Sequence, residues 1–147
     1  MLDETDTHIL TLLIQDARMS LKELAGRVNL SAPSVAERVR RLEERGVIRS
    51  FTVEIDPLAL GYTLEAIVRI RPLPGMLHLV EKLIADTPEV IACSKVTGDD
   101  CFIAHLCLRT INDLDGILDK ITQKAETNTS IVKSQTVRRR PPVLRAG

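Results

Sequence analysis

The spacing of apolar residues changes near residue 50, and this change divides the chain into two parts. Before Gly46 the apolar residues recur every three or four positions, as on one face of a helix. From Phe51 onward, segments with alternating apolar and polar residues appear between helical ones. With 147 residues, 44% of them hydrophobic, the chain can form one ordinary domain or two small ones, and its core requires neither disulfides nor a structural metal.

The first fifty residues contain the start and stop signals of three helices. The first helix is expected to begin near Asp3 or Thr5, where acidic residues complement the helix dipole. The second begins with the capping pattern Ser20–Glu23. The third has Ser31 as its N-cap and ends at Gly46. A short helix, a tight turn and a longer helix in this order predict a helix-turn-helix unit over residues 1–50.

The third helix has two different faces. Val35, Val39 and Leu42 form a narrow apolar stripe, and beside it small residues near the N-terminus are followed by arginines. Small side chains let a helix end approach base edges, and guanidinium groups contact phosphates or guanine. The alternative is a solvated face balanced by neighbouring glutamates. The capped preceding helix favours DNA contact, and the predicted contact residues are Ser31, Ala32, Ser34, Arg38, Arg41 and Arg45.

The second part alternates strands and helices. A short strand over 51–55 and a linker to residue 61 precede a βαββαβ unit over residues 62–138. The predicted class is α+β: an N-terminal winged helix-turn-helix joined to a ferredoxin-like domain. Its elements are expected at 64–71 (strand), 76–86 (helix), 90–97 and 101–109 (strands), 113–124 (helix) and 130–138 (strand).

The two faces of the predicted sheet differ in polarity. Phe102, Ala104, Leu106 and Leu108 fall on one face of their strand, which we assign to the core under the helices. The opposite face mixes apolar and charged side chains, including Ile67, Ile91, Cys93, Ile103 and Cys107. That face is too apolar for water and too charged for an ordinary core, so we expect a homodimer that packs sheet against sheet.

Charge is distributed unevenly although the net charge is zero. Residues 51–132 hold 7 Lys or Arg against 12 Asp or Glu, whereas residues 133–147 hold 5 Lys or Arg and no acid. The final segment, residues 139–147, is therefore a basic tail. It is either a solvated tail or an auxiliary contact to DNA or to a neighbouring subunit.

Several short motifs together resemble the Lrp/AsnC family of feast/famine transcription regulators over nearly the whole chain. They are Leu2-Asp-x-x-Asp6-x-x-Ile9-Leu10, Asn29-Leu-Ser-x-x-Ser34-Val35, Arg38-Val-x-Arg-Leu42-Glu43, Arg45-Gly-Val-Ile48 and Val96-Thr-Gly-Asp99. The resemblance implies operator DNA as a partner, an amino-acid effector, and dimers that assemble into tetramers or octamers. It also implies an effector site at the loop between the second and third strands, with the residues Gly98, Asp99, Asp100, Ser134 and Thr136.

A metal- or thiol-responsive regulator is the alternative, with Cys93, Cys101, His105 and Cys107 as candidate ligands. Residues four apart on a strand lie ~13 Å apart, which is too far to share one metal within a subunit. We therefore expect no metal and no cofactor. The chain also lacks a phosphate-binding glycine loop and HExxH, so we expect no catalytic residues and no enzyme. An acidic N-terminus and the absence of a long apolar segment predict a cytoplasmic protein with no membrane contact.

Overall fold

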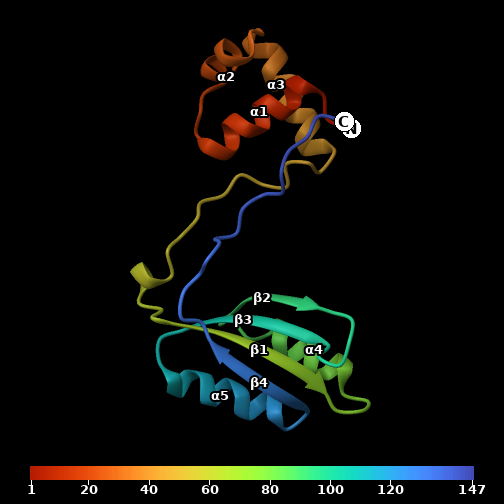
Figure 1. The fold of residues 1–147 in the computed structure, drawn as a ribbon, viewed down its shortest axis with the longest axis vertical. Coiled ribbons are helices and arrows are strands. Elements are labelled where there is room, and N and C mark those ends of the chain that lie inside the picture. The colour runs from red at the N-terminus through yellow and green to blue at the C-terminus, as the bar shows by residue number, and fades with distance from the viewer. The chain divides into compact units, whose positions relative to one another are not determined.

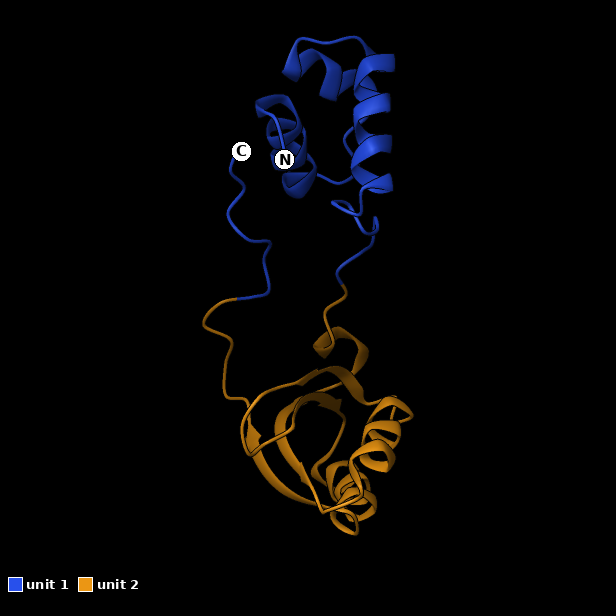
Figure 2. Cartoon of the chain, turned by 90° about the vertical axis from the view of Figure 1, so that its right-hand side faces the viewer, with its two compact units in different colours: residues 1–54, 138–147 blue, residues 55–137 orange.

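The computed structural model describes residues 1–147 and separates them into two compact units. Unit 1 comprises residues 1–54 together with residues 138–147, and unit 2 comprises residues 55–137 (Figure 2). The chain therefore passes between the units twice, once near residue 54 and once near residue 137.

Unit 1 contains the three predicted helices, α1 (Glu4–Gln15), α2 (Leu21–Val28) and α3 (Ala32–Glu44) (Figure 1). Asp3, Ser20 and Ser31 are their N-caps, and each side chain accepts a hydrogen bond from a backbone amide three residues on. Asn29 ends α2 with a left-handed backbone (φ 55°), which turns the chain sharply into α3. The buried core of this unit consists of Ile9, Leu12, Leu13, Leu24, Ala25 and Val35.

Unit 2 is a four-stranded antiparallel sheet with two helices on one face (Figure 1). The strand order β2-β3-β1-β4 confirms the predicted ferredoxin-like plan. Alternate residues of β1 and β3, such as Val68, Ile70, Ala104 and Leu106, are buried together with Val80 of α4. The elements are β1 (Leu64–Pro72), α4 (Leu77–Ala85), β2 (Val90–Lys95), β3 (Phe102–Leu108), α5 (Ile111–Thr122) and β4 (Ala125–Ile131), preceded by a 3₁₀ turn at Leu58–Leu60.

Two strand predictions were wrong: one strand lies at a different position, and the other does not form. The last strand spans Ala125–Ile131 rather than 130–138, because the polar sequence Glu126–Ser130 forms an edge strand that pairs only with β1. Residues 51–55 form no strand, and Phe51, Val53 and Ile55 are exposed. Their alternating pattern suits a strand, but a strand also requires a partner, and none lies beside them within the chain.

No helix in the structure has the length and apolar character needed to cross a membrane.

Candidate nucleic-acid interface and effector site

The N-terminus of α3 presents small side chains on an open surface. The Ser34 amide donates to Ser31 Oγ at 3.3 Å, and the two hydroxyl oxygens lie 2.8 Å apart. Ser31 and Ser34 are exposed, whereas Ala32 is half-buried against the core of unit 1. Val35 and Leu42 are buried, so the predicted apolar stripe does face the core. The adjoining stripe through Ser34, Arg41 and Arg45 is left accessible.

Arg38 connects α3 to the start of α1. Its Nη1 lies 2.7 Å from Asp3 Oδ2 and 2.9 Å from Asp6 Oδ1, and only 12% of the Asp6 side chain is exposed. A hydrogen bond from the Asp6 amide, followed by one from Arg38, lowers the pKa of the Asp3 carboxyl. Hydrogen bonds to both carboxylates raise the pKa of Arg38. This side chain therefore has a structural role that sequence spacing does not reveal, because its partners lie 32 and 35 residues away.

The side chains of Arg40 and Arg41 are more exposed than that of Arg38, at 55% and 65% against 32%. Arg41 Nε lies 3.0 Å from Glu37 Oε1, and Arg40 contacts both Glu37 and Glu44. Hydrogen bonds from Arg40 and Arg41 lower the pKa of Glu37 to about 2. Arg45 donates to the backbone oxygen of Met1 at 3.1 Å. Exposed ion pairs within one helix contribute little stability, so Arg41 can exchange Glu37 for a phosphate at small cost.

Replacing Arg38 by Ala should lower the free energy of unfolding by about 1–3 kcal/mol, because the nearly buried Asp6 carboxylate loses its charged partner. Replacing Arg41 by Ala removes the same charge from an exposed pair and should leave stability nearly unchanged. Urea denaturation followed by circular dichroism measures both. Equal losses in the two variants would contradict the role of Arg38 as the connection between α1 and α3.

The predicted effector loop connects β2 to β3. Gly98 adopts φ +104°, a backbone conformation that other residues rarely adopt. Asp99 is 91% exposed and Asp100 is half-buried. Arg71 of β1 holds the loop: its Nε donates to the backbone oxygen of Asp99 at 3.1 Å, and its Nη2 lies 3.8 Å from Asp99 Oδ2. Its Nη1 lies 3.8 Å from Glu126 of β4.

A cavity of about 230 Å³ lies beside this loop. Two guanidinium groups and two carboxylates line it together with an amide and a hydroxyl, supplied by Arg69, Arg71, Asp100, Glu126, Thr127 and Asn128. Sequence reasoning missed all of these except Asp100. The sequence did contain a signal for the two arginines. Arg69 and Arg71 alternate with the buried Val68 and Ile70, so both side chains fall on the sheet face opposite the helices.

Ser134 and Thr136 do not lie beside the loop within one chain. Both follow β4 and are exposed. Between them, Gln135 Nε2 donates to Glu65 Oε2 at 3.3 Å, whereas the loop is held by Arg71. Glu65 and Arg71 are separated by about 20 Å along β1. The predicted set is therefore divided between the two ends of the sheet.

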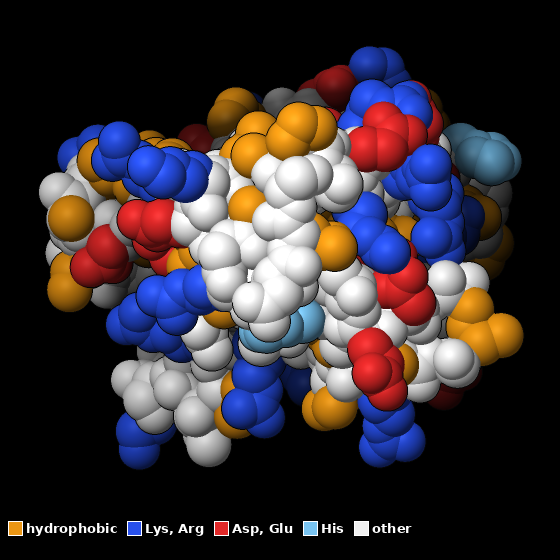
Figure 3. All heavy atoms as spheres, turned by 90° about the horizontal axis from the view of Figure 1, so that it is seen from above, with side chains coloured by type: hydrophobic (Ala, Val, Ile, Leu, Met, Phe, Trp, Pro, Cys, Tyr) orange, Lys and Arg blue, Asp and Glu red, His pale blue; other side chains and the backbone are white.

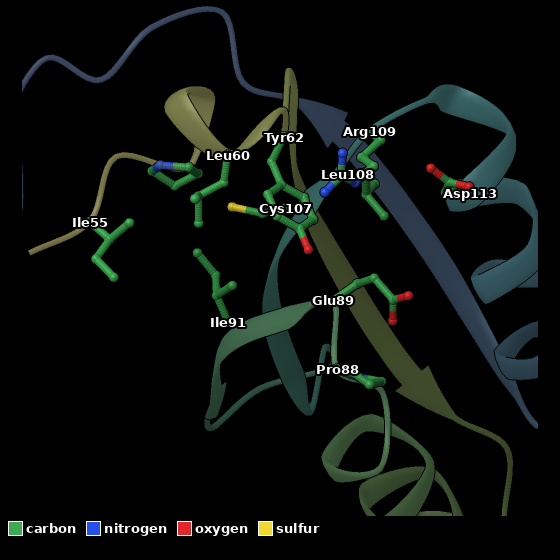
Figure 4. Close-up of a pocket in the computed structure, with 11 residues that line it drawn as sticks. Ile55, Leu60, Tyr62, Pro88, Glu89, Ile91, Cys107, Leu108, Arg109 and Asp113 are labelled. Carbon is green, nitrogen blue, oxygen red and sulfur yellow. The ribbon is translucent and has the colours of Figure 1, made fainter.

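A larger cavity of about 460 Å³ lies between the segment 55–62 and the sheet (Figure 4). Ile55, Leu60, Ile91 and Cys107 lie on one side of it, and Arg109, Glu89 and Asp113 lie on the other (Figure 4). The guanidinium carbon of Arg109 stacks 4.8 Å from the centre of the Tyr62 ring. This volume falls in the range of small-molecule sites.

The cysteines give no support to a metal site. No three His, Cys, Asp or Glu side chains lie close enough together to hold an ion. Burial, then nearby glutamates, raise the pKa values of Cys93 and Cys107, which disfavours the thiolate form that binds metals and reacts with oxidants. Cys101 packs against the buried core of unit 2, and His105 is half-buried on the opposite sheet face. After the register shift between Val90 and Ala92, Cys93 pairs with the buried Ala104, so it lies on the face of the helices and not, as predicted, on the face of Cys107.

Comparison with known proteins defines the class of protein first. A family model for winged helix-turn-helix DNA-binding domains matches residues 2–49, and a model for the Lrp/AsnC ligand binding domain matches residues 65–142. The HTH-type transcriptional regulator Rv2324 of Mycobacterium tuberculosis is 36% identical over 148 residues, which cover 96% of this chain and 98% of that protein. These matches define a helix-turn-helix transcriptional regulator with a ligand-binding domain.

Solved structures agree with this assignment. The structure of LrpC from Bacillus subtilis has a TM-score of 0.87 at 29% identity and covers 95% of this chain and 99% of that one. A feast or famine regulatory protein (Rv3291c) from M. tuberculosis, complexed with L-methionine, has a TM-score of 0.89 at 31% identity. The match covers 98% of this chain and 100% of that one. The chain belongs to the Lrp/AsnC family of transcriptional regulators.

Proposed function

We propose that this protein reads operator DNA with α3 and changes its DNA affinity or assembly when an amino acid binds beside the 98–100 loop. The observation that carries the DNA-reading part is the open N-terminus of α3, where Ser31 and Ser34 lie exposed at the end of a stripe that continues to Arg41 and Arg45. Such a helix end enters a major groove without steric hindrance. In this proposal the protein acts by binding rather than by catalysis, and it meets its DNA in the cytoplasm.

The arginines of α3 have different roles in this proposal. Arg41 and Arg45 contact phosphates or base edges, since both are exposed and only weakly held. Arg38 keeps α3 fixed against α1 and adds its positive charge from that position. Orientation of the reading helix therefore depends on Arg38, and contact with the duplex depends on the accessible side chains of the stripe.

Replacing Arg41 by Ala should weaken operator binding by ~1–3 kcal/mol if it contacts a base, or flatten the plot of log affinity against log salt by about one unit if it contacts a phosphate. Arg40→Ala is the matched control, because Arg40 lies on the same helix outside the stripe and its side chain is 55% exposed, against 65% for Arg41. Fluorescence anisotropy over a salt series distinguishes the two effects. Equal losses in both variants would show that α3 contributes only general charge.

The chemistry of the 230 Å³ cavity supports an amino acid as the effector. A free amino acid carries a carboxylate and an ammonium group, and the cavity offers Arg69 and Arg71 for the first and Asp100 and Glu126 for the second. Gly98 allows the loop backbone to approach the ligand closely. The cavity is smaller than a drug-sized site, which suits a molecule of this size. The L-methionine complex of the mycobacterial relative adds support.

Replacing Asp99 or Asp100 singly by Ala should reveal which carboxylate contacts the effector. Asp100 lines the cavity and Asp99 points into solvent, so Asp100→Ala should weaken amino-acid binding about tenfold or more, and Asp99→Ala should have the smaller effect. Thermal stability with each of the twenty amino acids selects the ligand, and calorimetry then gives its affinity. Glu89→Gln, in the larger cavity, is the control. If both loop variants bind as tightly as the parent, the effector site lies elsewhere.

The uncovered sheet face supports a homodimer that assembles further into tetramers or octamers. Ile67 and Ile103 are half-buried on that face, and Ile91 is 57% exposed. A second copy of the sheet removes this apolar surface from water. Because Ser134 and Thr136 lie far from the loop of their own subunit, they contribute to an effector site only if another copy places them there.

Replacing Ile91 by Asp should convert the dimer to a monomer, because it places an unpaired charge in the proposed sheet-to-sheet contact. Ile91 is exposed in the single chain, so the fold of each subunit should persist. Leu79→Asp is the matched control, since Leu79 is 50% exposed on α4, on the opposite side of the sheet. Light scattering at micromolar concentration measures the molar mass of each variant in solution. A dimeric Ile91→Asp variant would contradict this interface.

A further inference from the structure

The basic segment, residues 138–147, belongs structurally to the unit that contains the helix-turn-helix. It is grouped with residues 1–54 as one compact unit, although the match to the ligand-binding domain extends to residue 142 (Figure 2). The Gly147 amide donates to the backbone oxygen of Leu2 at 3.0 Å. Leu144 is half-buried, whereas the other residues of the segment are exposed. The segment is therefore anchored beside the start of α1 while its charged side chains remain in solvent.

The charge of the DNA-binding unit depends on this segment. Residues 1–54 contain eight Lys or Arg and nine Asp or Glu, a formal charge of −1. Residues 138–147 add four arginines and no acid, which brings unit 1 to +3. Neutralisation of DNA phosphates by Lys and Arg supplies nearly all of non-specific affinity. Three helices with a net negative charge are poorly suited to that task alone.

Ion pairing within the helices strengthens this argument. Arg38, Arg40 and Arg41 all contact carboxylates of unit 1. In the space-filling view from above, basic and acidic side chains are interspersed on the visible surface (Figure 3). By contrast, Arg138, Arg139, Arg140 and Arg145 form no ion pair or side-chain hydrogen bond anywhere in the chain. Their charges are fully available to an external anion.

The local sequence also favours an extended backbone for the segment that carries these arginines. Pro141 and Pro142 restrict the backbone that follows Arg140, and Pro141 disfavours a helical conformation at Arg140 itself. The segment has neither helix nor strand. Successive side chains of an extended chain point to opposite sides, so Arg138 and Arg140 lie on one side, about 6.6 Å apart. The phosphates of a duplex are dense enough for both side chains to be paired at this separation. Several arginines of such a segment can therefore meet phosphates together.

We infer that the basic segment is a second DNA-contacting element of unit 1, which binds the phosphate backbone of duplex DNA with Arg138, Arg139, Arg140 and Arg145 while α3 reads the bases. This inference rests on the proposed DNA-binding function. It assigns sequence-independent affinity largely to the segment and sequence discrimination to α3.

The test compares the full-length parent with the variant R138Q/R139Q/R140Q on a fluorescein-labelled random-sequence duplex over a salt series. Each lost phosphate contact should flatten the plot of log affinity against log salt by about one unit, so the variant should lose about one to three units. K82Q/K120Q/K124Q removes three positive charges from unit 2 and is the matched control, with an expected salt dependence equal to that of the parent. Thermal unfolding should be the same for all three proteins, because the substituted side chains are exposed or half-buried and make no core contact.

Several outcomes would overturn the inference. An unchanged salt dependence in R138Q/R139Q/R140Q would show that the segment does not contact DNA, and an equal loss in the lysine control would show an effect of net charge only. A change in mass by light scattering with unchanged DNA binding would assign the segment to a contact between subunits. If the parent protein binds neither the random duplex nor operator DNA, the proposed function fails together with this inference.

Discussion

The one-sided covering of the sheet is the constraint on which the rest of unit 2 depends. Helices α4 and α5 cover the face that contains Val68, Ile70, Ala104 and Leu106, and on the other face only the segment 55–62 lies against the sheet, near Cys107. The alternation of β1 therefore places Arg69 and Arg71 on the uncovered face, beside half-buried apolar residues. In our proposal the same face provides apolar surface for a second subunit and charged groups for a zwitterionic ligand at its edge. The proposed dimer contact and the proposed effector site are therefore neighbours on one surface.

In unit 1, some arginines pair with carboxylates of the same unit and others remain unpaired. The acidic residues that cap α1 hold Arg38 in place, so part of the positive charge of α3 serves the fold. Glu37 contacts Arg40 and Arg41, and because their hydrogen bonds lower its pKa to about 2, it stays ionised even in acidic solution. A reading helix that is partly neutralised by its own carboxylates has a small sequence-independent attraction to DNA. In our proposal the unpaired arginines of residues 138–147 supply that attraction without altering the surface that discriminates between bases.

Most of the fold could be predicted from local sequence patterns, because periodicity and capping act within a few residues. The three N-caps and the buried face of β3 are of this kind. β4 was misplaced because an edge strand of Glu, Thr and Asn carries little apolar alternation. Other features depend on tertiary contacts between distant segments. These are the ion pairs of Arg38 with Asp3 and Asp6 and the grouping of Arg69 and Arg71 with Glu126. Ser134 and Thr136 were joined to the loop by family resemblance, which does not state which subunit supplies each residue.

Chain continuity relates the two proposed sites to each other. β4 supplies Glu126, Thr127 and Asn128 to the effector cavity, and after residue 137 the same segment of chain enters unit 1 as the basic segment. An amino acid that orders β4 or changes subunit packing would therefore alter the restraint on the arginines that approach phosphate. Binding equilibria are reciprocal, so DNA that restrains the basic segment must change amino-acid affinity by the same factor by which the amino acid changes DNA affinity. Because the connection near residue 137 joins the two proposed sites, regulation of this kind would require no conformational change within the core of either unit.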